Sequence, residues 1–587
     1  MKKILLSALA VLATIPVSAQ WTSNSAENTQ LTNRYVQDWE VEPLSDGSTV
    51  IYYTYPERIA IGEDTVFGMK HYLVLYDKNG NSVWDSPLLV CHAPNRSFTM
   101  VNKYLFVDVD DNIMLSIPDT RYDTSGLLIA GEPWYGMNLT LYKINKNGEF
   151  LWGSDGIVID KNPHYLVAQA YAVGLENGSI IVSWSQMETS SSSLRTKLAR
   201  ISSAGEKIWE KNLDPAGADA TVVNGGNNEF IVVYTYGGTS AICAQKLDFN
   251  GDEVWGHTVI YNSGGYNAAP VHTWLKVLPV ERGAFISWMD DRDNNRFEDA
   301  YCSYINKDGQ LLSTGTDGVK LGYTENTRKF SPVGAYDADG KFVYYVWRET
   351  SSEQSWSRIV AQKVSLNGEL IWESNGIEIA PYLQRPASYA NVQMGTDGNV
   401  CFFYQQQTNY QADYAGIAQY RSANGDSLWN IVFSHVEGGD GRNYSQASLK
   451  VLPCYNDQWI AVWDDNRPDA NSLDNSSAYG QNIRIDGVLG EGGTSTEKPV
   501  SAIKTTNFRV SSNPVSDDVE FTVSNLRGAN VDITIVNPLG KQVSRVFNGR
   551  LSSDNQTFSW NVNVTKGIYL AVLKNGSKTE TIKLIIK

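Results

Sequence analysis

The sequence is poor in the residues that build most metal and disulfide sites. Its 587 residues include five cysteines and six histidines. No CxxC, HExxH or HxH spacing occurs, so the sequence predicts no histidine zinc site. An odd number of cysteines, scattered singly through apolar strand patterns, predicts small buried side chains rather than a disulfide framework. These residues are Cys91, Cys243, Cys302, Cys401 and Cys454.

Long apolar runs, helical periodicity and positive charge are also scarce. After residue 19 no run approaches the roughly 18 apolar residues of a membrane-spanning helix. No segment keeps a 3.6-residue apolar period, and only 19% of residues are charged, which favours strands and turns over helices. The net charge of -16 disfavours nucleic acids and anionic membrane surfaces as partners.

The first 19 residues, MKKILLSALAVLATIPVSA, have the features of a secretory signal peptide. Two lysines precede an apolar core that ends in small residues, and the segment is too short for a membrane span. We therefore predict cleavage before Gln20 and export of the mature chain. No cysteine follows the predicted cleavage point, so no lipoprotein anchor is expected.

One unit recurs eight times: an alternating run, a turn that ends in glycine, and a second run that usually ends in tryptophan. Gln245–Trp255 (QKLDFNGDEVW) is an example. An Asn-Gly turn between alternating runs predicts a hairpin with both turn residues at positive φ. Ser313 and Glu491 stand where two copies lack the tryptophan. The turn glycines are Gly80, Gly148, Gly205, Gly251, Gly309, Gly368, Gly425 and Gly487.

These repeats predict the fold. Each hairpin follows a strongly apolar strand and a weaker one, so each unit carries four antiparallel strands, the pattern of a β-propeller. Eight units at 20–490 predict eight blades. The last copy lacks an outer strand, and Gln20–Asn24 matches Ile371–Asn375 in sequence. We therefore expect the N-terminal segment to complete the last blade, with Trp21 in the place of Glu491, and to close the ring.

A different pattern begins after a linker at 491–504. Residues 505–587 predict the strands of a small immunoglobulin-like β-sandwich. This module resembles the type A C-terminal sorting domain of the Bacteroidetes type IX secretion system through Asn513, Pro514, Gly540, Lys541, Gly567, Tyr569 and Lys583. The resemblance implies contact with the secretion machinery and its sortase, removal of the module, and release or attachment at the cell surface. The propeller repeats, with W-x-D-x-R and G-x-x-x-W patterns, resemble secreted bacterial repeats of unknown function.

The most polar stretches follow the second strand of several units. Carboxylates beside arginines suit three roles: acid/base pairs for glycoside cleavage, a cradle for an anionic sugar, or, with Asn294 and Asp299, calcium ligands. Calcium is the one cofactor that the sequence leaves open. Recurrence of the pattern favours structural pairs, because a catalytic site is normally unique. The candidate ligand-binding residues are Asp119, Arg121, Asp290, Asp291, Arg292, Arg348, Asp464, Asp465 and Arg467.

The sequence contains no motif of a known catalytic site. It has no P-loop, no G-x-S-x-G elbow and no complete EF-hand loop. The sialidase Asp-box places tryptophan three residues after glycine, whereas here it falls four after, which reverses the side-chain face. We therefore predict a non-catalytic binding or adhesion propeller whose ligand is a glycan or a protein, contacted through aromatic loops at 404–410 and 134–135. The alternatives are a polysaccharide hydrolase or lyase that uses Asp290 or Asp464, and a structural surface-layer role.

Overall fold

The computed structural model describes two compact units that lie within Met1–Pro499 and Val500–Lys587. Both are built from β-strands, and no helix in the described part of the chain is long and apolar enough to cross a membrane. The predicted linker at 491–504 lies outside the described residues. These are residues 20–587 except 33–35, 37, 62–63, 92–103, 120, 122–137, 162–164, 189–193, 237–240, 263–274, 312–314, 385, 408–413, 437–445, 468–475, 491–507, 511–514, 516–517, 525, 527, 538–540, 554 and 577.

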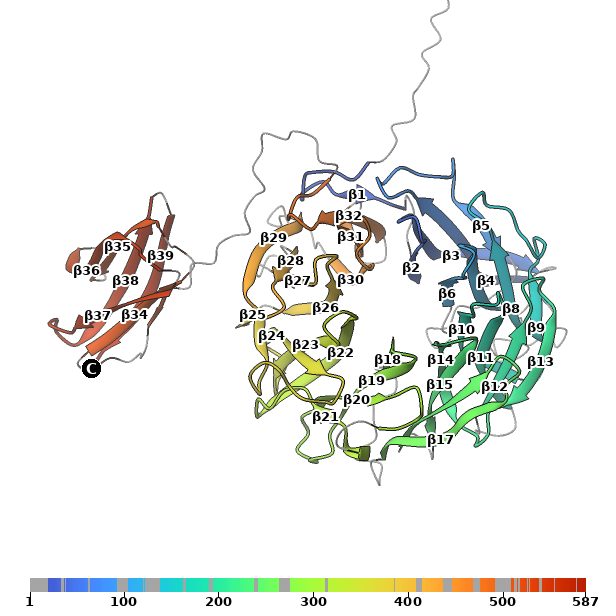
Figure 1. Ribbon diagram of the computed structural model, residues 1–587. Helices are drawn as coiled ribbons and strands as arrows, with labels where there is room; N and C mark the ends of the chain where they lie inside the picture. The colour runs from blue at the N-terminus through green and yellow to red at the C-terminus, as the bar shows by residue number, and fades with distance from the viewer. Residues whose placement is uncertain are drawn as a thin grey trace, which may run out of the picture. The chain divides into compact units, whose positions relative to one another are not determined.

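The first unit contains eight four-stranded antiparallel sheets among its described residues, arranged around a common centre as in a propeller (Figure 1). The first four sheets are β2 (Trp39–Pro43), β3 (Thr49–Ile61), β4 (Asp64–Tyr76) and β5 (Leu88–Cys91); β6 (Tyr104–Val107), β7 (Ile113–Asp119), β8 (Asn138–Ile144) and β9 (Ile157–Lys161); β10 (Tyr165–Gly174), β11 (Ile180–Glu188), β12 (Leu194–Ile201) and β13 (Lys207–Asn212); and β14 (Ala218–Gly226), β15 (Glu229–Tyr236), β16 (Ala241–Asp248) and β17 (Glu253–Asn262).

The remaining four sheets repeat the same order of strands from the centre outward. They are β18 (Lys276–Val280), β19 (Gly283–Asp290), β20 (Asp299–Ile305) and β21 (Val319–Lys320), with the short helix η3 (Gly315–Asp317) before β21; β22 (Thr327–Asp337), β23 (Phe342–Ser351), β24 (Ser357–Ser365) and β25 (Ile377–Leu383); β26 (Ala387–Met394), β27 (Val400–Gln407), β28 (Tyr414–Arg421) and β29 (Ser427–Val436); and β30 (Gln446–Val451), β31 (Gln458–Asp465), β32 (Ser477–Arg484) and β1 (Thr29–Gln30).

The core of this unit lies between neighbouring sheets. Every residue of β7 and of β19 is buried, because each sheet is covered on both faces and its second strand reads as a continuous apolar run. One buried cluster, for example, joins Phe285 of β19 to Tyr345 of β23. We call the interface between two successive sheets a junction. The cysteines are free, and four of the five are buried, which confirms the prediction of small core side chains.

The hairpin turns explain the recurring glycines. In all eight, the glycine lies at positive φ, between 76° and 93°, and its N–H donates to the carbonyl three residues earlier, as Gly251 does to Asp248 at 2.8 Å. The prediction that both turn residues have positive φ is wrong, because Asn250 is not among the positive-φ residues. The turn is the longer type in which only the last residue is left-handed.

The hairpin tryptophans bridge the junctions. The indole of Trp84 donates to the Lys146 carbonyl at 2.9 Å and lies against the turn glycine of the next sheet, Gly148. Trp209 and Trp429 make the same bond to Phe249 and Ile485. In every case the acceptor lies two residues before the turn glycine, so one contact recurs from sheet to sheet.

The N-terminal segment makes this contact too. Trp21 is buried, donates to the Lys78 carbonyl at 2.9 Å and packs on Gly80 of the first sheet. The strand that pairs with β32 is Thr29–Gln30, so the expectation that Gln20–Asn24 forms it is wrong. Gln20–Asn24 lies outside any strand, and its Ser23 contacts Gly490.

The second unit has two antiparallel sheets around one core. That core joins Phe521 of one sheet to Ile533 and Leu584 of the other. The first sheet contains β33 (Phe508–Val510), β34 (Asp518–Ser524) and β37 (Asn555–Asn561). The second contains β36 (Gln542–Arg550), β35 (Asn530–Val536), β38 (Gly567–Asn575) and β39 (Lys578–Ile586).

Candidate functional site

The candidate residues of the first unit gather at one end of its sheets. In an antiparallel sheet of this order, the second and fourth strands end on the same side, which we call the loop end. Asp119, Asp290 and Asp465 are the last residues of the second strands β7, β19 and β31. Arg348 lies near the end of β23, also a second strand. Each residue belongs to a different sheet.

Three of these sheets carry the same buried aspartate–arginine pair. Asp290 is 1% exposed, and it accepts hydrogen bonds from Trp288 Nε1 at 2.7 Å and from Arg292 Nη2 at 2.6 Å. The Arg292 main-chain N–H adds a third bond at 3.1 Å. Such charge-assisted bonds fix both side chains and occupy the carboxylate oxygens.

The other two pairs repeat this geometry. Arg467 donates to Asp465 from Nε at 2.9 Å and from Nη2 at 2.6 Å, and Trp463 donates to the same carboxylate at 3.1 Å. Arg121 donates from Nε to Asp119 at 2.9 Å. Thr140 takes the place of the tryptophan as the additional donor there, at 2.9 Å.

Each of these arginines also fastens a loop. Arg121 donates to the Asp155 carbonyl at 2.7 Å, and Arg467 to the Ala26 carbonyl at 3.0 Å. Arg292 donates to the Asp317 carbonyl, and its guanidinium lies 3.6 Å from the ring centre of Tyr301, within cation–π range. The pairs therefore join the second strand to the loop before the outermost strand, and their carboxylates are already saturated with donors.

The other predicted carboxylates also have partners. Asp291 accepts the main-chain N–H groups of Asn295 and Arg296, each at 2.9 Å, so it caps the loop. Asp299, proposed as a calcium ligand, is held by the ammonium groups of Lys320 at 2.5 Å and Lys329 at 2.7 Å. Two cations already neutralise this carboxylate. No cluster of three or more metal-binding side chains occurs among the described residues.

Arg348 differs from these arginines. It follows Trp347 directly, so it points to the opposite face of β23, toward the next sheet. Within the described residues its Nε has no hydrogen-bond partner, and burial lowers the pKa of its guanidinium. Its guanidinium interacts electrostatically with Tyr389 of β26, a residue at a positive φ of 51°.

Two further polar groups occupy the same repeat position on the next two sheets. Gln405 follows Tyr404 as Arg348 follows Trp347; it is 1% exposed, and neither of its amide atoms has a partner in the described part of the chain. Asp464 follows Trp463, and its Oδ1 is likewise unpaired there. Sequence analysis missed Gln405, although its place beside a repeated aromatic residue was a usable signal.

Charged groups surround Asp464 at the junction with the first sheet. Burial raises the pKa of Asp464 to about 7, against hydrogen bonds from Ser448 and Trp39 and the charge of Lys450. Burial and the nearby Glu40 raise the pKa of Glu42 to about 7 as well. Lys450 donates to the Trp39 carbonyl at 2.8 Å. Two carboxyl groups that titrate near neutral pH therefore share one lysine.

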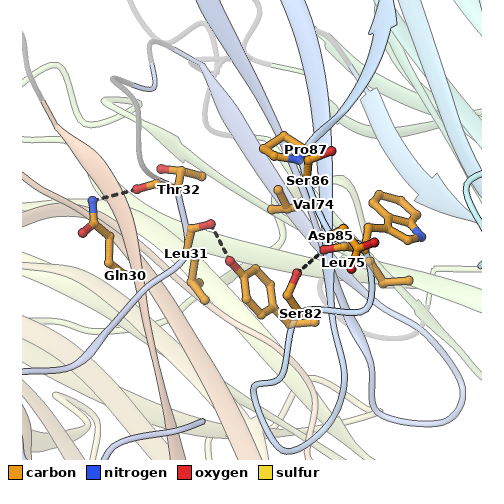
Figure 2. A pocket seen from close by; sticks show the side chains of 11 residues that line it. Gln30, Leu31, Thr32, Val74, Leu75, Ser82, Asp85, Ser86 and Pro87 are labelled. Atoms are coloured by element: carbon orange, nitrogen blue, oxygen red, sulfur yellow. Dashed lines mark hydrogen bonds between the residues drawn. The ribbon is translucent and has the colours of Figure 1, made fainter. Parts of the chain in front are cut away.

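A separate cavity of about 200 Å³ lies beside the N-terminal segment (Figure 2). Leu31 and Thr32 form one side, and Val74, Ser82 and residues 84–87 of the first sheet form the other. Tyr76 donates to the Leu31 carbonyl at 2.7 Å across it. The volume is below the roughly 300–1,000 Å³ of typical ligand pockets, and its hydrogen bonds fasten the segment that pairs with β32.

The predicted aromatic loops do not supply a surface in the described residues. Tyr404 is 2% exposed and belongs to a core cluster with Phe402, so its assignment to an exposed loop was wrong. Residues 408–410 and 134–135 lie outside the described part of the chain.

The predicted sorting residues lie in the second unit. Tyr569 is buried, and its hydroxyl donates to the Thr565 carbonyl at 2.9 Å. Gly567 begins β38, and Leu570 of β38 pairs with Lys583 of the neighbouring strand β39. Lys541 lies at a turn and donates its N–H to Asn537. Asn513, Pro514 and Gly540 lie outside the described residues.

Comparison with known proteins identifies this second unit. Residues 512–587 match the family model of the secretion system C-terminal sorting domain. No curated protein matches the chain. A protein of unknown function from Dyadobacter fermentans is 9% identical over 79% of this chain and 97% of its own, with a TM-score of 0.34. The GH93 α-L-arabinofuranosidase of Fusarium graminearum is 10% identical over 55% and 94%, with a TM-score of 0.30. Likenesses this weak say nothing of what the chain binds.

Proposed function

Since its C-terminal sorting domain sends this protein through type IX secretion to the outer surface or the medium, we propose that the first unit is a binding module. It is an eight-bladed propeller, closed by the N-terminal segment, that holds a ligand at its loop end without cleaving it. Pairing of β1 with β32 and the contact of Trp21 with Gly80 support the closure.

Unpaired polar groups on three successive junctions support a ligand site at this end. Arg348, Gln405 and Asp464 occupy one repeat position on consecutive sheets, and each carries at least one buried polar atom without a partner in the described residues. A buried polar atom without a hydrogen bond costs roughly 1–3 kcal/mol. Three such atoms in neighbouring positions are the groups that a ligand would satisfy.

The state of the repeated carboxylates argues against cleavage by them. Asp290 and Asp465 each accept bonds from a tryptophan and an arginine, so neither has the freedom to hold a water or protonate a leaving group. Asp290 is therefore excluded as a catalytic residue of the alternative hydrolase or lyase, and Asp464 remains the candidate for that role.

One observation favours that alternative. The carboxyls of Asp464 and Glu42 both have a pKa raised to about 7, and a carboxyl that is protonated near neutral pH can act as a general acid. A polysaccharide-cleaving propeller that uses this pair is therefore the second candidate function.

One experiment separates the two functions. The purified full chain is applied to immobilised bacterial and host polysaccharides, and both retention and released reducing sugar are measured. We expect retention without release, and about tenfold weaker retention for Arg348→Gln, because a bond to a charged group contributes roughly 1.5–3 kcal/mol. Asp291→Asn, at the same end, serves as the control. Released sugar that disappears in Asp464→Asn would replace the binding function with the catalytic one.

A further inference from the structure

The two ends of the sheets expose different side chains. Among the described residues of the first unit, every exposed aromatic side chain lies at the loop end, at or beside the end of a second or fourth strand or the start of a first or third. The opposite end exposes single aliphatic residues that precede the hairpin tryptophans, such as Val83 and Leu151. The exposed aromatic residues are Tyr236, Tyr323, Trp356, Tyr382 and Tyr389.

Two of these aromatic residues form a stacked pair on the sheet β22–β25. The rings of Trp356 and Tyr382 lie 5.9 Å apart at an angle of 22°, and the residues are 40% and 38% exposed. Trp356 is fixed by main-chain bonding, because its carbonyl accepts from Ser351 N–H at 3.0 Å. Tyr382 lies beside Leu383, which pairs with Ser357. The pair is thus an exposed aromatic surface formed by an anchored loop residue, Trp356, and a residue of β25, Tyr382.

Charged and polar groups border this pair. The Arg358 guanidinium lies 5.9 Å from the Tyr382 ring centre, and Glu349, which is 1% exposed, accepts its Nη2 at 2.6 Å. Arg358 also donates to Thr324 at 3.1 Å and lies 3.6 Å from Glu378. The buried Glu349 holds the guanidinium in place, so the polar border is as rigid as the rings.

We propose that Trp356 and Tyr382 form a platform on which a pyranose ring of a polysaccharide stacks, with Arg358 and Glu378 bonding its hydroxyls. A pyranose has an apolar C–H face and a hydroxyl rim, which fits an aromatic surface with a bordering donor and acceptor. A nucleobase would also stack, but the net charge of -16 repels its phosphates. The inference rests on the proposed function because it uses the same end of the propeller.

The test compares Trp356→Ala and Tyr382→Ala with Tyr236→Ala. Tyr236 is a matched control, since it is an aromatic residue 41% exposed at the same end but on the sheet β14–β17, where it contacts His257. The probes are immobilised glucan, mannan, xylan and galactan, applied to the full chain. We expect at least tenfold weaker retention for Trp356→Ala on the polysaccharide that binds, as for a central aromatic contact, and partial recovery in Trp356→Phe.

The outcomes separate this inference from the proposed function. Retention that falls in Arg348→Gln but not in either platform variant would overturn the platform and leave the proposed function standing. Retention that falls equally in Tyr236→Ala would also overturn it, because the loss would not be specific to this sheet. Absence of retention on all four polysaccharides would overturn the sugar platform, while a protein ligand would still satisfy the binding function.

Discussion

Replacing Trp21 by alanine tests the proposed N-terminal closure of the propeller. The indole is 3% exposed, packs on Gly80 and donates to the Lys78 carbonyl at 2.9 Å. Truncation of a buried tryptophan costs roughly 3–5 kcal/mol, and the lost hydrogen bond about 1 kcal/mol more. We therefore expect Trp21→Ala to lower the free energy of unfolding by about 4–6 kcal/mol, much of the roughly 5–15 kcal/mol that a typical domain has.

The measurement is equilibrium unfolding of the full chain in urea. Trp152→Ala is the control, because that indole makes the same kind of bond, to Ser203 at 3.2 Å, but is partly exposed and joins two sheets that are adjacent in the chain. It should cost less than half as much. A loss below about 1 kcal/mol for Trp21→Ala, or an equal loss for both variants, would refute the reasoning, since truncation of the more deeply buried indole should cost more.

Three further predictions concern charge and export. Arg292→Ala should cost about 3–5 kcal/mol in urea unfolding, because it leaves the buried Asp290 carboxylate unpaired, whereas a loss within about 1 kcal/mol would mean that the pair is not structural. The folded-state pKa of Asp464 is raised from 3.8 to about 7, so between these pH values the native state binds more protons at Asp464 than the unfolded chain does. The contribution of Asp464 to the free energy of unfolding is therefore present below about pH 4 and is lost as the pH rises through 7. The urea midpoint should therefore decrease as the pH is raised from 5 to 8, and it should decrease less in Asp464→Asn than in the control Asp291→Asn. An equal dependence of the urea midpoint on pH in both variants would contradict this. Deletion of residues 512–587 should abolish appearance of the protein on the surface or in the medium, measured by blotting of cell fractions, and undiminished export would show that another signal acts.

The sequence predicted the repeated features of the fold better than the particular ones. The turn glycines could be predicted because a left-handed turn position restricts the residue type. Their positions in turn predicted the order of the strands in each sheet. The hairpin length was misjudged because Asn250-Gly251 also fits a shorter turn with two left-handed residues. Pairing by the N-terminal segment was anticipated from Trp21, but the strand itself, Thr29–Gln30, is too short to carry a pattern.

The candidate site was harder to predict because neighbouring residues of a strand face opposite ways. Arg292 and Arg348 both follow a tryptophan of a second strand, yet Arg292 folds back on Asp290 while Arg348 faces the next sheet. Counting residues from the tryptophan of each strand would have distinguished Arg348, which follows Trp347 directly, from Arg292, which does not follow Trp288 directly. Tyr404 occupies the equivalent position of the sheet β26–β29, and it is buried in the core as Trp288 and Trp463 are. Trp356 and Tyr382 could not be foreseen, because Trp356 precedes β24 and Tyr382 lies in β25, and the two rings meet only when these strands pair.

The pairing of β1 with β32 has a consequence for the order in which the molecule folds. Trp21 lies near the beginning of the chain, and β32, which pairs with the same segment, ends only at Arg484. This pairing therefore cannot form until the last sheet exists, and contacts between residues so far apart in the chain form slowly. A chain shortened within the final repeat would keep most of its sheets but offer β1 no partner. The proposed closure of the propeller therefore requires a chain that reaches the last repeat.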